Sequence, residues 1–335
     1  MIRLIIAAVF AVTVAWPNQK TENAPVFEQV SDHCFFMQLG SNGKNIAAVI
    51  TEQGALLVNP PDGPDLATAL GALENITYGK VKSSPEVRWV AITDHHFFAN
   101  SGTRYFAEGG AVLLASTKLY ALATPESVTD FWNPATFMPE LQFEGSAEVR
   151  PLTWFLFDSQ MHLFPENLEI RILALEHKAR TGGDVVVFVP EEEVLIVGDL
   201  YQKGCFPDID TDSEGDALEW IAGLKQVIEA VPLFKQAIKP ETPEEESEPD
   251  LEGPPEEKTL EEQVIVLSSR GEASNLQDMK DLLEISQKLQ RDLSRAVKSG
   301  RKIESFLKSS AAGNYQSYSN LDSYATKLYE VLSLK

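Results

Sequence analysis

Cysteine is scarce in this chain, which has two, Cys34 and Cys205, among 335 residues. Two thiols are too few for the disulfide framework of small exported domains, and too few for a zinc site made of cysteines. One lies near an expected strand and the other in an expected loop, far apart in the sequence. The sequence leaves two alternatives open, a single disulfide or two independent thiols.

Basic residues are also few. The chain has 28 Lys and Arg against 50 Asp and Glu, which gives a net charge of −22. The segment Glu241–Glu262 holds eleven acidic residues and one Lys, or −10, and this leaves −12 for the rest of the chain. Binding to phosphate backbones or anionic lipid needs clustered Lys and Arg. We therefore expect no nucleic-acid partner.

Long apolar runs are missing except at the N-terminus, where Arg3 precedes the run Leu4–Ala15. This run is too short to span a bilayer, and Thr13-Val14-Ala15 is typical of a signal-peptide cleavage site. We interpret residues 1–16 as a signal peptide; the alternatives are an uncleaved anchor or a misassigned start. The interpretation predicts an exported protein, periplasmic or extracellular, with no membrane span after signal removal.

The common sequence signatures of three enzyme classes are absent as well. The chain contains no G-x-S-x-G nucleophile elbow, no Walker loop and no dinucleotide-binding glycine fingerprint. Each of these motifs supplies a turn or phosphate cradle that its chemistry requires. The sequence therefore gives no support to a serine hydrolase of that type, a P-loop enzyme or a nucleotide-dependent dehydrogenase.

The most informative stretch that is present runs from Val87 to Thr117. It begins with an apolar strand, Val87–Ile92, which ends in the polar residues Thr93-Asp94-His95-His96. Polar groups at the end of a buried strand are a common way for α/β folds to expose chemistry. Imidazole and carboxylate are ordinary ligands of zinc and iron, so this stretch is a candidate metal site.

The rest of the chain shows the same pattern twice, short apolar strands followed by amphipathic helices. This pattern predicts an α/β (α+β) domain in which two mixed sheets pack face to face with helices outside, a four-layer αββα sandwich. The expected strands are 26–30, 34–39, 45–50, 55–58, 87–92, 111–115, 153–157, 161–164, 168–174, 185–189, 194–197 and 264–267, and the expected helices are 65–73, 103–108, 218–231 and 276–297.

Composition places the domain boundaries. We expect the sandwich to occupy residues 25–310, interrupted at 239–262 by an acidic insertion rich in Pro and Glu. Such a composition buries too little apolar surface to fold, so the insertion is predicted to be disordered. Helical patterns over 301–308 and 315–334 predict a C-terminal helical tail at 311–335.

Four segments, in order, resemble the metallo-β-lactamase superfamily, from about Val26 to Val297. The resemblance implies a four-layer sandwich that holds one or two metal ions, usually zinc and sometimes iron. In such a site the metal generates a hydroxide nucleophile near neutral pH. The four segments are NIAAVITEQGALLVNPP, VRWVAITDHHFFANSGTRYFAEGGAVLLAS, RTGGDVVVFVPEEEVLIVGDLYQKGCFPDID and VIVLSSRGEA.

The first ligand motif of that family, T-H-x-H-x-D-H, is only partly present. Thr93 and His96 match it, whereas Asp94 stands at the position of the first His. Phe98 and Ala99 stand where the family has Asp and His, and neither side chain can bind a metal. By resemblance, the usual ligand set is already incomplete here.

The later ligand positions have changed too. Arg180 stands at the His position before the turn Thr181-Gly182-Gly183-Asp184, and Arg270 stands at the last His position. Asp199 keeps the family residue. Arg stays protonated and has no lone pair to offer, so it cannot replace a His ligand. Of seven ligand positions, the resemblance finds the family residue only at His96 and Asp199.

These substitutions predict a degenerate site without a cofactor. If the fold is correct, Asp94, His96, Arg180, Asp199 and Arg270 converge, and the carboxylates and guanidiniums form an ion-pair cluster in the metal's place. The hypothesis is a metal-free, non-catalytic relative, a pseudoenzyme that binds a small ligand, with Arg180 and Arg270 suited to an anion, or a protein partner.

Two alternatives remain. The first is a metal-dependent hydrolase with a rebuilt zinc or iron centre, for which the candidate ligands are Asp94, His95, His96, His177 and Asp199. The second is an interaction protein that works through its C-terminal helices. No residue pattern names a substrate.

Overall fold

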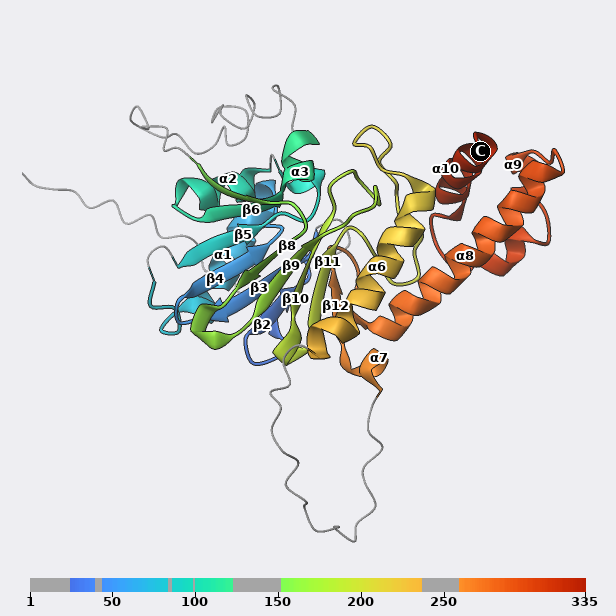
Figure 1. The fold of residues 1–335 in the computed structure, drawn as a ribbon. Helices are drawn as coiled ribbons and strands as arrows, with labels where there is room; N and C mark the ends of the chain where they lie inside the picture. The colour runs from blue at the N-terminus through green and yellow to red at the C-terminus, as the bar shows by residue number, and fades with distance from the viewer. Residues whose placement is uncertain (1–24, 40–43, 84–85, 99, 123–151, 237–258) are drawn as a thin grey trace, which may run out of the picture.

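Two β-sheets pack face to face in the computed structural model, which describes residues 25–39, 44–83, 86–98, 100–122, 152–236 and 259–335 (Figure 1). The first sheet has seven strands in sequential order, antiparallel from β1 to β4 and parallel from β4 to β7. Its strands are β1 Glu28–Gln29, β2 Cys34–Met37, β3 Ile46–Thr51, β4 Gly54–Val58, β5 Val87–Ala91, β6 Val112–Ser116 and β7 Thr153–Phe157.

The second sheet has six strands in the order β13-β12-β11-β10-β9-β8. All neighbours in it are antiparallel except the parallel pair β11 and β12. Both sheets are therefore mixed, as predicted. The strands are β8 Gln160–Leu163, β9 Ile170–Ala174, β10 Val185–Val189, β11 Val194–Gly198, β12 Ile265–Ser268 and β13 Ser274–Asn275.

Helices cover the two outer faces (Figure 1). Helices α1 Gly63–Thr77 and α2 Ser101–Glu108 pack on the first sheet, and α3 Thr117–Leu122 lies beside β6 and β7. The second sheet is covered by α6 Ala217–Gln236 and α8 Leu276–Lys298, and α10 Leu321–Ser333 packs against both of these helices. Two shorter helices are α7 Leu260–Gln263 and α9 Ile303–Leu307.

Strand alternation explains why the sandwich has four layers. In β3, Ala47 and Val49 point into the core between the sheets, and Ala48 and Ile50 point to the helices outside. All four are buried, because successive side chains point to opposite faces and both faces are covered. Strand β10 divides its side chains in the same way. The predicted αββα sandwich is confirmed.

The C-terminal segment is part of the packed structure. Residues 311–335, predicted as a helical tail, contain α10, whose Tyr324 and Leu328 are buried in the core formed with α6 and α8. The predicted signal peptide at 1–16 lies outside the described residues, and so does most of the predicted insertion at 239–262. Cys34 is buried and Cys205 half-buried, and both are free thiols.

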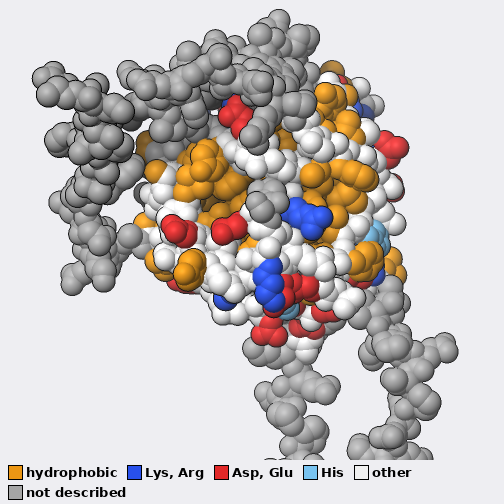
Figure 2. Space-filling view, turned by 90° about the vertical axis from the view of Figure 1, so that its left-hand side faces the viewer, with side chains coloured by type: hydrophobic (Ala, Val, Ile, Leu, Met, Phe, Trp, Pro, Cys, Tyr) orange, Lys and Arg blue, Asp and Glu red, His pale blue; other side chains and the backbone are white. Residues whose placement is uncertain are grey.

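On the face drawn in Figure 2, Lys and Arg side chains are few, and one of them lies beside a group of acidic side chains. Within the described part of the chain, none of the helices has the length and apolar character needed to span a bilayer.

Candidate functional site

The candidate site lies where β4, β5 and β11 end and β10 begins, and Thr93 contacts residues at each of these strand ends. The Asn59 side chain accepts a hydrogen bond from Thr93 N at 3.0 Å and donates one to Thr93 Oγ1 at 2.6 Å. The amide of Val185 donates to Thr93 O at 2.7 Å. Gly198 has a φ of +59°, and a Cβ there would lie 2.1 Å from Thr93 Oγ1, so only glycine allows this approach.

Asp94 follows directly and is almost completely buried, at 1% exposure. Its Oδ1 accepts a hydrogen bond from His96 N at 2.9 Å, which caps the short 3₁₀ helix His95–Phe97. Burial alone would raise the pKa of Asp94, but the contact with His96 and the charges of Arg180 and Lys44 hold that pKa below its usual value. Asp94 is therefore a buried carboxylate anion.

Arg180 pairs both with Asp94, which stands at a His position of the family motif, and with Asp199, which keeps the family residue. Its guanidinium nitrogens lie 3.6 Å from Asp94 Oδ1 and 3.6 Å from Asp199 Oδ2, and its side chain is 11% exposed. Burial lowers the pKa of Arg180, but the surrounding carboxylates outweigh it and raise that pKa overall. One fixed cation thus bridges two buried carboxylates.

A second cation, Lys44, completes the pairing. Its Nζ lies 3.0 Å from Asp199 Oδ2 and 3.9 Å from the centroid of the Phe97 ring, and its side chain is 26% exposed. A cation over an aromatic face is stabilised by the ring quadrupole. Lys44 belongs to no motif; its only sequence signal is a basic residue before an expected strand, in a chain with few basic residues.

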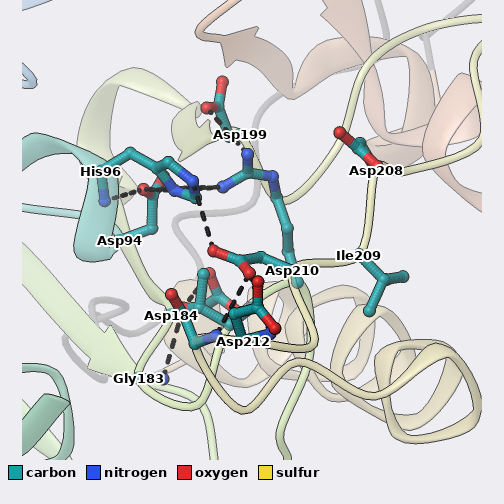
Figure 3. Close-up of polar contacts among 12 residues, drawn as sticks. Asp94, His96, Gly183, Asp184, Asp199, Asp208, Ile209, Asp210 and Asp212 are labelled. Carbon is teal, nitrogen blue, oxygen red and sulfur yellow. Dashed lines mark hydrogen bonds and ion pairs between the residues drawn. The ribbon is translucent and has the colours of Figure 1, made fainter.

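His96 joins the cluster to a loop that the sequence analysis also overlooked. Its ring is 37% exposed, and Figure 3 shows its contacts with Asp94 and Asp210. Nδ1 lies 3.0 Å from the Arg180 guanidinium and 3.1 Å from Asp94 Oδ1, and Nε2 lies 3.3 Å from Asp210 Oδ2. Nδ1 therefore faces both a donor and an acceptor, and Nε2 faces a carboxylate. Asp210 also accepts hydrogen bonds from the amides of Asp212 and Ser213, which help to lower its pKa although burial opposes them.

Beneath the cluster lies Asp184, which is buried and accepts hydrogen bonds from Thr181 N at 2.7 Å and Thr181 Oγ1 at 3.0 Å. Burial and the nearby charge of Asp94 raise the pKa of Asp184 to about 8. At neutral pH this side chain is mostly protonated. The cluster therefore contains no third full negative charge at this position.

The structure thus brings together Asp94, His96, Arg180 and Asp199, and it leaves Arg270 outside the ion-pair cluster. The Arg270 side chain is exposed and forms no ion pair with a residue in the described ranges. The reason is local: Asn45 Nδ2 donates to Ser268 O at 3.1 Å and to Gly271 O at 2.7 Å, so this turn presents its backbone to the interior. The predicted role of Arg270 as the second internal cation is taken by Lys44.

The alternative ligand set is not assembled. His177 lines a groove along α6 with Gln226 and Leu233, and the ring of His95 is only half buried. Across the described ranges, no three His, Cys, Asp or Glu side chains lie close enough to hold a metal ion. Asp94 and Asp199, the two carboxylates of that set, already face Arg180 and Lys44. This donor set does not fit a metal in the observed arrangement.

No family model matches this chain, and neither does any curated protein. Solved structures do match. A metallo-beta-lactamase from Pontibacter korlensis is 14% identical, with 78% of this chain and 99% of that one covered and a TM-score of 0.52. The DIM-1 metallo-beta-lactamase is also 14% identical, with 79% of this chain and 98% of that one covered and a TM-score of 0.52. The metallo-beta-lactamase FIM-1 from Pseudomonas aeruginosa, in its mono-zinc form, is 15% identical, with 79% of this chain and 96% of that one covered and a TM-score of 0.51.

The matched structures share one fold, and the sheet order and layers described above are those of that fold. The chain has the metallo-β-lactamase fold, and the resemblance seen in its sequence is confirmed at that level.

Proposed function

We propose that this protein is a metal-free, non-hydrolytic member of the metallo-β-lactamase fold that binds a small anionic ligand. The observation that carries the proposal is the position of Arg180, 3.6 Å from the carboxylates of both Asp94 and Asp199. In this account Arg180 and Lys44 supply the positive charge that a metal ion supplies in a hydrolase of this fold.

Electrostatics supports the substitution. A buried carboxylate is costly unless it is paired, and here Arg180 and Lys44 pair two of them. A divalent ion added at the same place would meet two fixed cations. At about 4 Å and an effective dielectric constant of about 20, each pair of unit charges repels by about 4 kcal/mol. The existing pairing therefore opposes metal entry.

The ligand class follows from the cations that remain accessible. Arg180 is engaged by carboxylates, so it contributes less to anion binding than the sequence suggested. Lys44 pairs with Asp199 but is partly exposed, and Arg270 is exposed. Their segments adjoin because Asn45 N donates to Ser269 O at 2.8 Å. Lys44 and Arg270 together would bind a carboxylate or a phosphate group. If residues 1–16 are a signal peptide, this ligand is met outside the cytoplasm.

One observation favours the second candidate, a hydrolase with a rebuilt metal centre. Asp94 Oδ2 and His95 Nδ1 are buried and have no hydrogen-bond partner within the described ranges. A cation could satisfy both atoms. Two free atoms are fewer than the three protein ligands of a catalytic zinc, so this candidate also needs a rearrangement of Arg180 that frees Asp199.

Two measurements on the full chain test the proposal. A screen of ester, lactam and thioester substrates, with and without added zinc, should show no turnover; turnover lost in both Asp199→Ala and His96→Ala would establish the hydrolase instead. Titration with phosphate and acetate, followed by NMR, should show binding that Lys44→Met and Arg270→Met each weaken several-fold. The control is Lys302→Met, an exposed Lys before α9. Equal binding in all variants would refute the anion site and favour a protein partner.

A further inference from the structure

The loop that carries Asp210 is held by the C-terminal helical segment, which lies far from it in the sequence. Residues 199–216 connect β11 to α6, and Asp210 is the acidic side chain in this loop that contacts His96. On its other side the loop contacts the residues before and within α10. The position of the Asp210 carboxylate thus depends on what fixes this loop.

The first attachment is a set of backbone hydrogen bonds. The amide of Phe206 donates to Ser319 O at 3.0 Å, and the amide of Ser319 donates to Gly204 O at 2.9 Å. The Phe206 ring stacks on Tyr324 of α10, with centroids 5.1 Å apart and planes 7° apart. Both rings are buried, so this end of the loop is anchored in the core.

The second attachment is made by two side chains that bind carbonyl groups of the loop. Asn320 Nδ2 donates to Phe206 O at 3.2 Å and to Pro207 O at 3.1 Å. Lys327 Nζ donates to Ile209 O and pairs with Asp208 Oδ1 at 3.0 Å. Ile209 is the residue immediately before Asp210, so Lys327 acts one peptide away from the site.

The opposite side of the loop rests on Arg180. The amide of Asp210 donates to Arg180 O at 2.9 Å, and the amide of Gly215 donates to Asp210 O at 2.7 Å. A Cβ at Gly215 would lie 2.1 Å from Arg180 O, so the loop approaches the Arg180 backbone as closely as glycine permits. Asp210 is therefore clamped between α10 and the backbone of Arg180, the central cation.

From these contacts we infer that the C-terminal segment is a positioning element of the site, in which Lys327 and Asn320 set the contact between Asp210 and His96. The amides of Asp212 and Ser213, which donate to Asp210, belong to the same loop and move with it. They alone therefore do not fix Asp210 relative to His96. The attachments to α10 and to Asn320 fix the loop so that the Asp210 carboxylate stays 3.3 Å from His96 Nε2. This role goes beyond ligand binding at Lys44 and Arg270, and it does not depend on what the ligand is.

The test is a spectroscopic signature at His96 in the full chain, with ¹⁵N-labelled histidine and His96→Gln to assign the ring signals. Lys327→Met and Asn320→Asp should each shift the His96 Nε2 resonance and speed solvent exchange of its proton several-fold, while thermal unfolding shows that the fold persists. Asn320 has a φ of +60°, which Asp tolerates, so that change keeps the backbone conformation. It replaces the amide donor by a carboxylate, which the carbonyl oxygens of Phe206 and Pro207 repel, and so breaks this attachment.

Rescue and control separate positioning from general destabilisation. Lys327→Arg keeps a charged donor and should restore the wild-type His96 signal, and Lys302→Met should leave it unchanged. An unchanged His96 signal in both Lys327→Met and Asn320→Asp would overturn the inference. A change of equal size in the Lys302→Met control would overturn it too.

Discussion

The guanidinium of Arg180 lies 3.6 Å from the buried carboxylate of Asp94, two residues brought together from the loop before β10 and the end of β5. The same guanidinium reaches Asp199 at an equal distance. An ion pair at this point fixes three strand ends to one another without an added ion.

Removing the bridging cation should destabilise the protein. Arg180→Met leaves Asp94 buried without its cation, and breaking one side of a buried pair typically costs about 3 kcal/mol or more. Asp199 remains paired with Lys44 in this variant. The loss in free energy of unfolding should therefore not exceed that expected for one unpaired carboxylate. Urea denaturation measures the free energy of unfolding. Arg270→Met, which removes an exposed Arg outside the cluster, should change it by less than about 0.5 kcal/mol.

Asp184 should make stability fall as pH rises. Its pKa is about 8 in the folded protein and near 3.8 when exposed, so the folded state binds more protons between these values. The contribution of Asp184 is therefore fully present at about pH 4 and is lost progressively toward pH 8 and above.

Asp184→Asn stays neutral and should flatten this part of the stability profile. The free energy of unfolding of Asp184→Asn should increase relative to that of wild type as pH rises. Urea denaturation of both proteins at several pH values measures this difference. Asp32→Asn, an exposed substitution, should run parallel to wild type. A wild-type profile that rises from pH 5 to pH 8 in step with Asp184→Asn would contradict the assignment.

Glu192 should act in the opposite direction. From the turn between β10 and β11 it accepts hydrogen bonds from the Ser31 hydroxyl and from the backbone and ring of His33, so it ties the N-terminal strands to the second sheet. Burial alone would raise its pKa, but these donors hold the pKa of Glu192 below its usual value. Its stabilisation is therefore present above about pH 4.5 and is lost as pH falls through the lower, folded pKa.

Glu192→Gln should cost about 1–3 kcal/mol at pH 7, since it weakens several charge-assisted hydrogen bonds. The difference from wild type should shrink in acid, where Glu192 itself becomes protonated. Thermal unfolding at pH 7 and pH 3 measures both effects. Glu74→Gln, on the exposed side of α1, is the matched control. An equal loss there would show that the hydrogen bonds of Glu192 to Ser31 and His33 contribute nothing specific.

The sequence predicted the sandwich because its signals are local. Alternation of apolar side chains, as in Ala47 to Ile50, is read directly along a strand, and each expected strand or helix overlaps an observed one. Asp94, His96, Arg180 and Asp199 were placed by resemblance to a motif whose positions are fixed by strand ends.

Other parts of the site depend on tertiary packing and could not be found that way. Lys44 and Asp210 belong to no motif, and they reach the cluster because the start of β3 and the loop before α6 lie at the same edge of the sandwich. Arg270 occupies a motif position, but the hydrogen bonds of Asn45 to its turn decide where its side chain points. Such choices are made by long-range contacts, which a linear pattern does not encode.

We propose that Arg180 and Lys44 occupy the place of a metal ion. Isothermal titration of zinc into the full chain after chelation, with metal content measured by mass spectrometry before chelation, tests this proposal. We expect no stoichiometric metal in the purified protein and no one-to-one zinc binding tighter than about 1 µM, which corresponds to about −8 kcal/mol. One zinc or iron per chain, lost in both Asp94→Ala and Asp199→Ala, would contradict it.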